Sequence, residues 1–288
     1  MNELCLPLLL CLTITSARTQ EIANPAPFTV MLMHQQPIAN PAPFAVMLMQ
    51  QQPIADPDTL TATVFQLPGG ASAQGRPMVD GATRDLSRLR VSVHTLGAGQ
   101  SFAPTPGDNS DHLLIMEQGR LAVDIDTLHK DLGPGGVGLF AAGARPSLHN
   151  KGSGNAVFYL FSFLSRQAVN ADQAKAPGSP IVIDWPDLTM KKTDKGESRQ
   201  IFSCPVAWLS KIDMHATTLD PGQISHPQHM HRAEEIILLR SGHVRMHIAD
   251  GYQNASAGDL VFLPSGVPHD LENGPGGRTE YFALQWAL

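Results

Sequence analysis

The sequence predicts an all-β protein in which one β-sheet unit occurs twice. Glycine (25 residues) and proline (23 residues) are abundant and only 16% of the residues are charged, which favours many turns over long helices. A self-comparison that aligns Leu86 with Leu209 matches two long segments, and both show the alternating apolar pattern of β-strands. At 288 residues, the chain is long enough for two domains.

Charge and cysteine content exclude several classes of function. The net charge of −6 is spread thinly along the chain, and no cluster of Lys and Arg alternates with aromatic residues. We therefore expect no binding to nucleic acid or to an anionic membrane surface. Cys5 and Cys11 lie in an N-terminal apolar run, which leaves Cys204 without a disulfide partner in the body of the chain.

The first 17 residues have features of a secretory signal peptide. Leu4–Thr15 is an apolar run of the right length, too short to span a bilayer, and small residues permit cleavage after Ala17. This predicts a periplasmic or secreted protein without a membrane span. The leading segment carries Glu3 and no Lys or Arg, which is atypical of a signal peptide, so the alternative is a cytoplasmic protein.

Residues 18–57 contain a tandem repeat with a period of sixteen residues. The two copies are Ile22–Pro37 and Ile38–Pro53. This period is too short for solenoid repeats, and the apolar part of each copy fits a short strand or an adaptable Met-rich patch. The alternative is a Cu(I) site, because thioether and imidazole side chains recur in both copies. These side chains are Met31, Met33, His34, Met47 and Met49.

The internal repeat sets the expected domain boundaries. One deletion in the downstream half of the alignment places Gly136 on Gly258 and Tyr159 on Tyr281. A stretch of small and polar residues with two prolines separates the copies and is typical of a linker. We therefore predict a first unit at residues 58–165, a linker at 166–180 and a second unit at 181–288.

The second unit contains a candidate metal site. His229, His231 and Glu235 share the same parity, so on an extended strand their side chains project from one face. His269 follows a turn-rich run that begins at Pro264, and the returning strand can bring it to the same point. Three imidazoles and a carboxylate suit a divalent transition metal (Mn, Fe, Ni, Zn or Cu) and suit calcium poorly.

The full spacing of these residues resembles the two motifs of the cupin superfamily. The first motif reads Gly222, six residues, His229-x-His231, three residues, Glu235, six residues, Gly242. The second reads Gly258, five residues, Pro264-x-Gly266, two residues, His269, three residues, Asn273. The resemblance implies that each unit is a jelly-roll (double-stranded β-helix) barrel and that His229, His231, Glu235 and His269 are metal ligands.

The first unit looks like a degenerate cupin barrel. The residues at its four ligand positions are Pro106, Asp108, His112 and Ser147. Proline and serine are poor metal ligands, which favours a structural or docking role. Two alternatives stay open. One is a weak metal site that uses Asp108 and His112, with His149 near the lost fourth position, and the other is an organic ligand in the emptied interior.

A site with four ligands leaves coordination positions open for a guest. The metal can then serve isomerisation, hydrolysis or reaction with dioxygen, and fold alone does not choose among them. We favour dioxygenase-type oxidation of a small organic molecule by a monomer or homodimer. The alternatives are a non-catalytic binding or sensing protein and a barrel that the metal merely stabilises. Candidates to hydrogen-bond a metal ligand or bound substrate are His226, Gln228 and Asn273.

Overall fold

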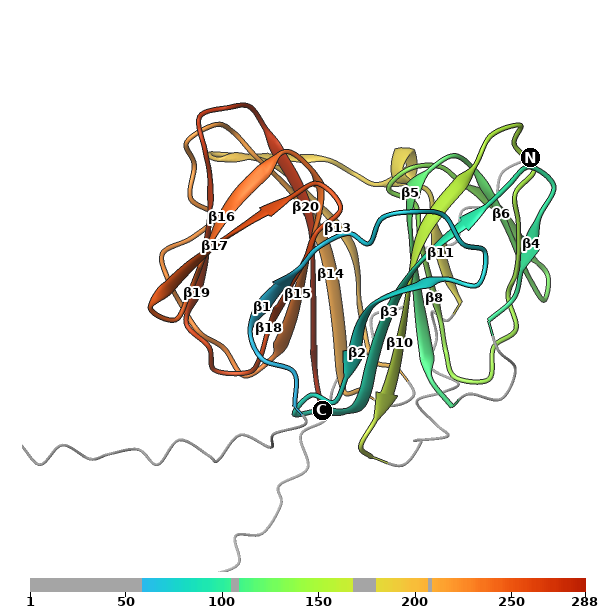
Figure 1. Cartoon of the computed structure of the whole chain (residues 1–288), viewed down its shortest axis with the longest axis horizontal. Helices are drawn as coiled ribbons and strands as arrows, with labels where there is room; N and C mark the ends of the chain where they lie inside the picture. Colours follow the sequence, from blue (N-terminus) through green and yellow to red (C-terminus); the bar gives the residue numbers. More distant parts are fainter. Residues whose placement is uncertain (1–58, 105–108, 168–179, 207–208) are drawn as a thin grey trace, which may run out of the picture. The chain divides into compact units, whose positions relative to one another are not determined.

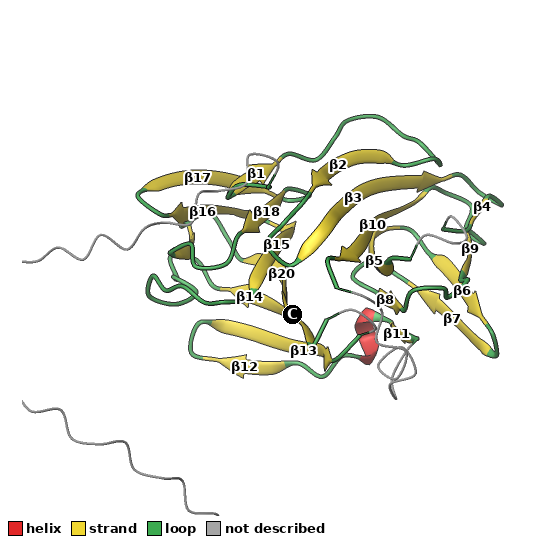
Figure 2. Cartoon of the chain, turned by 90° about the horizontal axis from the view of Figure 1, so that it is seen from below, coloured by secondary structure: helices red, strands yellow, loops and turns green. Residues whose placement is uncertain are grey.

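The computed structural model describes residues 59–104, 109–167, 180–206 and 209–288. All of these belong to one compact unit, Gln52–Leu288. The predicted signal peptide, the sixteen-residue repeat and most of the predicted linker at 166–180 lie outside the described residues. Twenty strands and one short 3-10 helix, Trp185–Asp187, make up the described secondary structure (Figure 2), so the all-β prediction is confirmed. Within these ranges no helix is long and apolar enough to cross a membrane.

The first barrel consists of two antiparallel sheets. A six-stranded sheet has the order β11-β8-β5-β10-β3-β2, and a four-stranded sheet has the order β4-β9-β6-β7. Its strands are β2 (Arg76–Gly81), β3 (Leu86–Leu96), β4 (Ser101–Phe102), β5 (Asp111–Gln118), β6 (Leu121–Ile125), β7 (Leu128–Leu132), β8 (Val137–Phe140), β9 (Ser147–His149), β10 (Ala156–Ser165) and β11 (Ile181–Ile183).

The second barrel repeats this arrangement. Its larger sheet has the order β1-β18-β15-β20-β14-β13-β12, and its smaller sheet has the order β17-β16-β19. Figure 1 shows β16, β17, β19 and β20 together in the orange and red half of the chain. The strands are β1 (Thr63–Phe65), β12 (Lys191–Thr193), β13 (Gly196–Cys204), β14 (Lys211–Leu219), β15 (Glu234–Ser241), β16 (His243–Ile248), β17 (Gly251–Ser256), β18 (Leu260–Leu263), β19 (His269–Asn273) and β20 (Thr279–Ala287).

Two strands belong to the sheet of the barrel that is not next to them in the chain. β1 precedes the first barrel in the chain but pairs with β18 of the second, with Val64 opposite Val261. β11 begins the segment that we assigned to the second barrel, yet it pairs with β8 of the first, with Val182 opposite Gly138. Pairing at these edges satisfies backbone groups that would otherwise be exposed on β8 and β18. The domain boundaries at 58 and 181 therefore do not coincide with the sheet boundaries.

The strand pairings of the two copies match at a constant offset of 123 residues, so the deletion inferred from the sequence is wrong. The amide of Gly135 donates to Met116 O, and the amide of Gly258 donates to Leu239 O in the matching place, both at 2.8 Å. Gly135 and Gly258 also share a positive φ, of 85° and 91°. The sequence comparison had aligned Gly136 with Gly258, because the two copies share few residues in this region.

This one-residue error reverses the direction of the side chains on the last strand of each copy. In the structure, Phe158 lies opposite Met116 as Tyr281 lies opposite Leu239, so Phe158 is the counterpart of Tyr281. Tyr159 instead points to the interface, where its hydroxyl donates to Gly258 O of the other barrel at 3.1 Å. Successive residues of a strand face opposite sides, so a slip of one residue exchanges interior and interface.

A single hydrophobic core joins the two barrels. It combines buried side chains of the first barrel, such as Phe161 and Phe163, with Met214, Phe262 and Trp286 of the second. The Trp286 ring packs edge-on against Phe163, with their centroids 5.7 Å apart. Two further core clusters fill or line the interior of each barrel separately. The larger sheets therefore contribute one face to the shared core and the other to their own barrel.

Candidate metal site and cavity

The candidate ligands come from two chain segments that pair beside the entrance to the second barrel. Only Glu235 lies within β15, which begins at Glu234, whereas His229 and His231 lie in the loop before it. The expected continuous strand is therefore interrupted. His229 still forms an isolated antiparallel bridge with His269, in which each amide donates to the carbonyl of the other at 3.1 and 2.8 Å. That bridge, rather than strand parity alone, brings the two motifs together.

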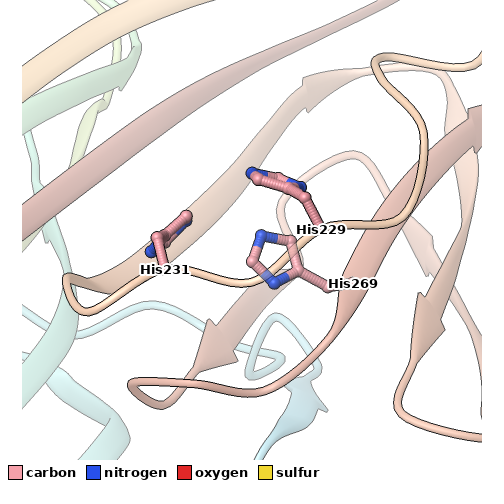
Figure 3. Close-up of side chains that lie close together, drawn as sticks. All are labelled: His229, His231 and His269. Carbon is pink, nitrogen blue, oxygen red and sulfur yellow. The ribbon is translucent and has the colours of Figure 1, made fainter.

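Three imidazoles and one carboxylate meet at this point. One ring nitrogen from each of His229, His231 and His269 lies within 4.8 Å of the other two, so the three side chains could hold a metal ion (Figure 3). Glu235 Oε2 lies 3.1 Å from His231 Nε2 and 3.2 Å from His269 Nε2. All four residues predicted from the sequence therefore gather at one site.

Backbone contacts determine which nitrogen of two rings faces the site. His231 Nδ1 lies 2.8 Å from Ala233 O, and His269 Nδ1 lies 2.8 Å from Val267 O. A carbonyl oxygen only accepts hydrogen bonds, so both Nδ1 atoms carry the proton and a neutral ring presents an Nε2 lone pair to the site. Such fixed rings are typical of metal-binding histidines.

These lone pairs need a cation. His269 Nε2 is buried and has no hydrogen-bond partner in the described part of the chain, since its contact with Glu235 lacks the geometry of a hydrogen bond. Two imidazole lone pairs and a carboxylate would repel one another unless a proton or a metal ion lies between them. The site therefore fits a divalent transition metal, for which nitrogen and carboxylate donors at short distances are suitable ligands.

The protonation equilibria reflect the same crowding. Burial alone would raise the pKa of Glu235, but its contacts with His231 and His269 outweigh burial and lower that pKa to about 2. The hydrogen bond with Glu235 raises the pKa of His231, whereas burial and the neighbouring His269 lower the pKa of His229. A carboxylate that stays ionised beside imidazoles can balance the charge of a bound cation.

A cavity of about 480 Å³ extends from these residues into the second barrel. Side chains of odd residue number on the central strands line it, including His215 and Thr217 on β14 and Tyr281 and Gln285 on β20. Burial raises the pKa of Tyr281 to about 12, against the lowering effect of neighbouring hydroxyl groups, so its phenol is a hydrogen-bond donor at neutral pH. Sequence analysis alone could not place these residues, because the side that each strand presents depends on its register.

Comparisons with known proteins support the same fold. A family model described as a cupin domain matches residues 215–283, which span the candidate ligands. An oxalate decarboxylase from Lactobacillus farciminis, solved as a formate complex, has 15% sequence identity and a TM-score of 0.59, covering 80% of this chain and 87% of that one. A serine-to-alanine mutant of Bacillus subtilis oxalate decarboxylase has 15% sequence identity and a TM-score of 0.58, covering 80% of this chain and 78% of that one. The chain therefore has the fold of a bicupin, that is, two cupin barrels in one chain.

Other comparisons agree on the fold without identifying an activity. AerE from Microcystis aeruginosa is 14% identical to this bicupin with a TM-score of 0.57, over 74% of this chain and 97% of that protein. Identities this low establish the fold alone. The search of curated proteins finds no match to this sequence.

The three residues proposed to support the metal ligands have different positions. The His226 ring lies against that of His229, with a centroid separation of 3.9 Å, and it lines the cavity. Gln228 points outward, where its amide nitrogen lies 3.3 Å from His247 Nδ1 and 3.1 Å from Ala249 O. The bicupin thus has His226 available for a guest, and the expectation for Gln228 is wrong because its loop turns the side chain away.

Asn273 has a structural role. Its amide nitrogen donates to Leu219 O, Asp220 O and Gly277 O at 3.0, 3.0 and 2.9 Å. Asn150 is its counterpart in the first cupin and donates in the same way to Leu96 O at 2.8 Å, although the ligand motif is lost there. The expectation that Asn273 assists the metal ligands is therefore wrong. Its place in the motif reflects the turns that it joins.

The first cupin retains none of the second cupin's acceptor cluster among its described residues. His112 occupies the position of Glu235, is buried and lies 3.0 Å from Ser162 Oγ through Nδ1. The constant offset places Pro146, not Ser147, at the position of His269, since Ser147 pairs with β6 as Asp270 pairs with β16. Pro106 and Asp108 lie outside the described residues.

The interior of the first cupin is filled by aromatic side chains. Phe158 stacks on His94 with a centroid separation of 5.1 Å, and Phe102 packs against both rings. Phe140 is buried in the same cluster. This packing leaves a structural role as the best interpretation of the first cupin and disfavours an organic ligand in its interior.

Proposed function

We propose that this bicupin is a metal-dependent oxidoreductase that uses dioxygen to oxidise a small organic molecule in the cavity of its second barrel. The observation that carries the proposal is the combination of a preformed acceptor cluster with an adjacent cavity. His229 is exposed at one side of the cluster, whereas His269 and Glu235 are buried. A guest can therefore reach the cluster from the cavity side without displacing a protein ligand.

A divalent redox metal, when bound, supplies open coordination positions and electron transfer to a substrate beside it. The residues of the chain itself perform the remaining tasks. Ala233 O and Val267 O hold the imidazoles of His231 and His269 in one orientation. Tyr281 and Thr217 offer hydroxyl groups to a substrate oxygen.

Two considerations favour oxidation over hydrolysis. One wall of the cavity is apolar, with Ile237, Leu271 and Ala283 among its members, and an apolar wall does not position the water that hydrolysis consumes. The fold is also compatible with redox chemistry, because proton-coupled electron transfer and Mn(II) centres are described for oxalate decarboxylase. The metal of this bicupin can be Mn, Fe, Ni, Zn or Cu, but a dioxygen-dependent reaction requires one of the redox-active ions.

The test is elemental analysis of protein purified without added metal, followed by measurement of oxygen uptake with candidate substrates. We expect about one transition metal ion per chain, and loss of both metal and oxygen uptake in His231→Ala and Glu235→Ala. His243→Ala, on the exposed side of β16, is the matched control and should retain both. A metal-free protein, or a variant that loses the metal yet still consumes oxygen, would contradict the proposal. Stoichiometric metal without oxygen uptake would instead favour a binding or sensing function.

A further inference from the structure

We infer that the second barrel accepts a neutral or singly acidic molecule with an apolar body of ring size, rather than a two-carbon dianion such as oxalate. This inference rests on the proposed function, since it concerns the guest of the same site. Three features of the cavity carry it, namely its two unlike walls, its charge balance, and the residues that keep it open.

The cavity has one apolar wall and one polar wall. Its volume of about 480 Å³ greatly exceeds the size of a two-carbon diacid, which would leave most of the space to water. Leu219, Ile237, Met246, Leu271 and Ala283 form the apolar wall. An apolar body placed against them gains roughly 25 cal/mol for each Å² removed from water.

The polar wall carries mainly neutral hydrogen-bonding groups. It includes Ser198, Thr217, Tyr281 and Gln285. Ser225 Oγ also faces this region and is buried beside Tyr281, but it makes no hydrogen bond of good geometry among the described residues. Hydroxyl and amide groups of this kind fix the orientation of a phenol, enol or carbonyl oxygen without requiring a charged ligand.

The charges around the cavity disfavour a dianion. Lys195 is the one cationic Lys or Arg among the lining residues, and its Nζ already donates to Ser225 O at 3.0 Å. Arg199 and Arg278 neutralise Glu197 from outside the cavity, at 3.4 and 3.0 Å.

The other lining carboxylates are Asp194, Glu235 and Asp270. Together with Lys195 they leave two negative charges, which a divalent metal balances. A bound dianion would then have no compensating cation, and an uncompensated charge in a partly desolvated cavity is costly.

Comparison of the two copies shows which residues keep the cavity open. Ser225 and Phe102 occupy equivalent positions, as do Tyr281 and Phe158, at the offset of 123 residues. Phe102 and Phe158 fill the first barrel with rings whose centroids are 6.0 Å apart. A Ser225→Phe substitution should therefore close the second cavity in the way that the chain already closes the first.

The experiment titrates the full-length, metal-loaded protein with 4-nitrocatechol, a singly ionised ring compound near neutral pH, and separately with oxalate. Binding is read from the visible absorbance of the probe, and competition with 4-nitrocatechol reports the affinity of oxalate. We expect saturable binding of 4-nitrocatechol at least tenfold tighter than binding of oxalate. Ser225→Phe should weaken 4-nitrocatechol binding at least tenfold. The control Ser203→Phe makes the same change at an exposed position of β13 that does not line the cavity, and it should stay within threefold of wild type.

The outcomes separate this inference from the proposed function. Metal content, measured on every sample, should be unchanged in Ser225→Phe and in the control because neither side chain is a candidate metal ligand. Absence of metal from the wild type overturns the proposed function and the inference together. Two results obtained with normal metal content would overturn the inference alone. In one, oxalate binds as tightly as 4-nitrocatechol, and in the other, Ser225→Phe binds 4-nitrocatechol as tightly as the wild type does. Should circular dichroism show that Ser225→Phe is unfolded, Ala283→Leu, which copies Leu160 of the first barrel, provides the same test.

Discussion

Replacing Glu234 with glutamine is expected to destabilise both barrels at once. Glu234 begins β15 beside the candidate ligand Glu235 but points to the opposite side, into the interface, where it is fully buried. Its Oε1 accepts a hydrogen bond from the amide of Arg84 at 2.9 Å. Its Oε2 accepts from Thr83 Oγ1, the amide of Asp85 and Trp286 Nε1, at 2.6, 3.2 and 3.0 Å. One carboxylate thus joins a loop of the first barrel to the last strand of the second.

The expected loss of unfolding free energy in Glu234→Gln follows from the number of hydrogen bonds that the carboxylate accepts. A glutamine amide nitrogen at the position of Oε1 leaves the Arg84 amide unsatisfied, at a cost of about 1–3 kcal/mol. The three bonds at the other oxygen weaken from charged to neutral, by roughly 0.5–1.5 kcal/mol each. Removal of a buried charge offsets part of this cost, so we expect a net loss of about 2–4 kcal/mol. For a protein of this size, that lowers the melting temperature by roughly 4–16 °C.

The assay is urea denaturation in the presence of a chelator, followed by fluorescence and circular dichroism. The chelator removes any contribution of metal binding to the stability of the folded state. Glu272→Gln is the control, because Glu272 pairs with Arg245 on the exposed side of β19 and its loss should cost less than about 1 kcal/mol. Both probes should report one transition, since the barrels share a core. A Glu234→Gln protein within 0.5 kcal/mol of wild type, or separate transitions for the two barrels, would refute this reasoning.

Two further predictions concern pH and the N-terminus. Burial raises the pKa of Asp111 from 3.8 to about 7, so between these values the folded protein holds a proton that the unfolded chain has released, and stability falls as the pH rises through 7. Asp111→Asn should therefore raise the unfolding free energy by about 4 kcal/mol at pH 8 and by little at pH 4, because each pKa unit corresponds to about 1.4 kcal/mol. An equal gain at both pH values in urea titrations would count against this. If residues 1–17 are a signal peptide, N-terminal sequencing of protein recovered from an exporting host should begin at Arg18, whereas an intact N-terminus in the cytosol would favour the cytoplasmic alternative.

The sequence was sufficient to find the acceptor cluster because its members lie in two short motifs. Within each motif, fixed spacing and turn residues constrain the backbone locally, and the pairing of His229 with His269 then requires one long-range contact. The strand parity used in the prediction was only partly correct, since His231 lies before β15 and a bend at residues 232–233 separates the two. The spacing compensated for this error because the bend returns the side chain to the same face.

The remainder of the site depended on strand register, which the sequence alone does not determine. His215 faces the cavity because β14 pairs with β20 with His215 opposite Ala283. Gln285 faces it because β15 pairs with β20 with Glu235 opposite Gln285. The misplaced deletion gave Tyr281 the wrong counterpart in the first barrel. The exchange of β1 and β11 between the sheets was equally inaccessible, because short apolar strands carry no signal that names their partner.

The filled interior of the first barrel helps to support the open interior of the second. An open cavity forgoes the packing that buried side chains provide, and this loss lowers stability. In this bicupin the shared core buries Phe161 and Phe163 against Phe262 and Trp286, so the sheet that carries the cavity is supported from its opposite face. The aromatic cluster around Phe158 fills the interior of that supporting barrel. The loss of metal ligands from the first barrel is therefore consistent with a role in holding the second barrel open for its guest.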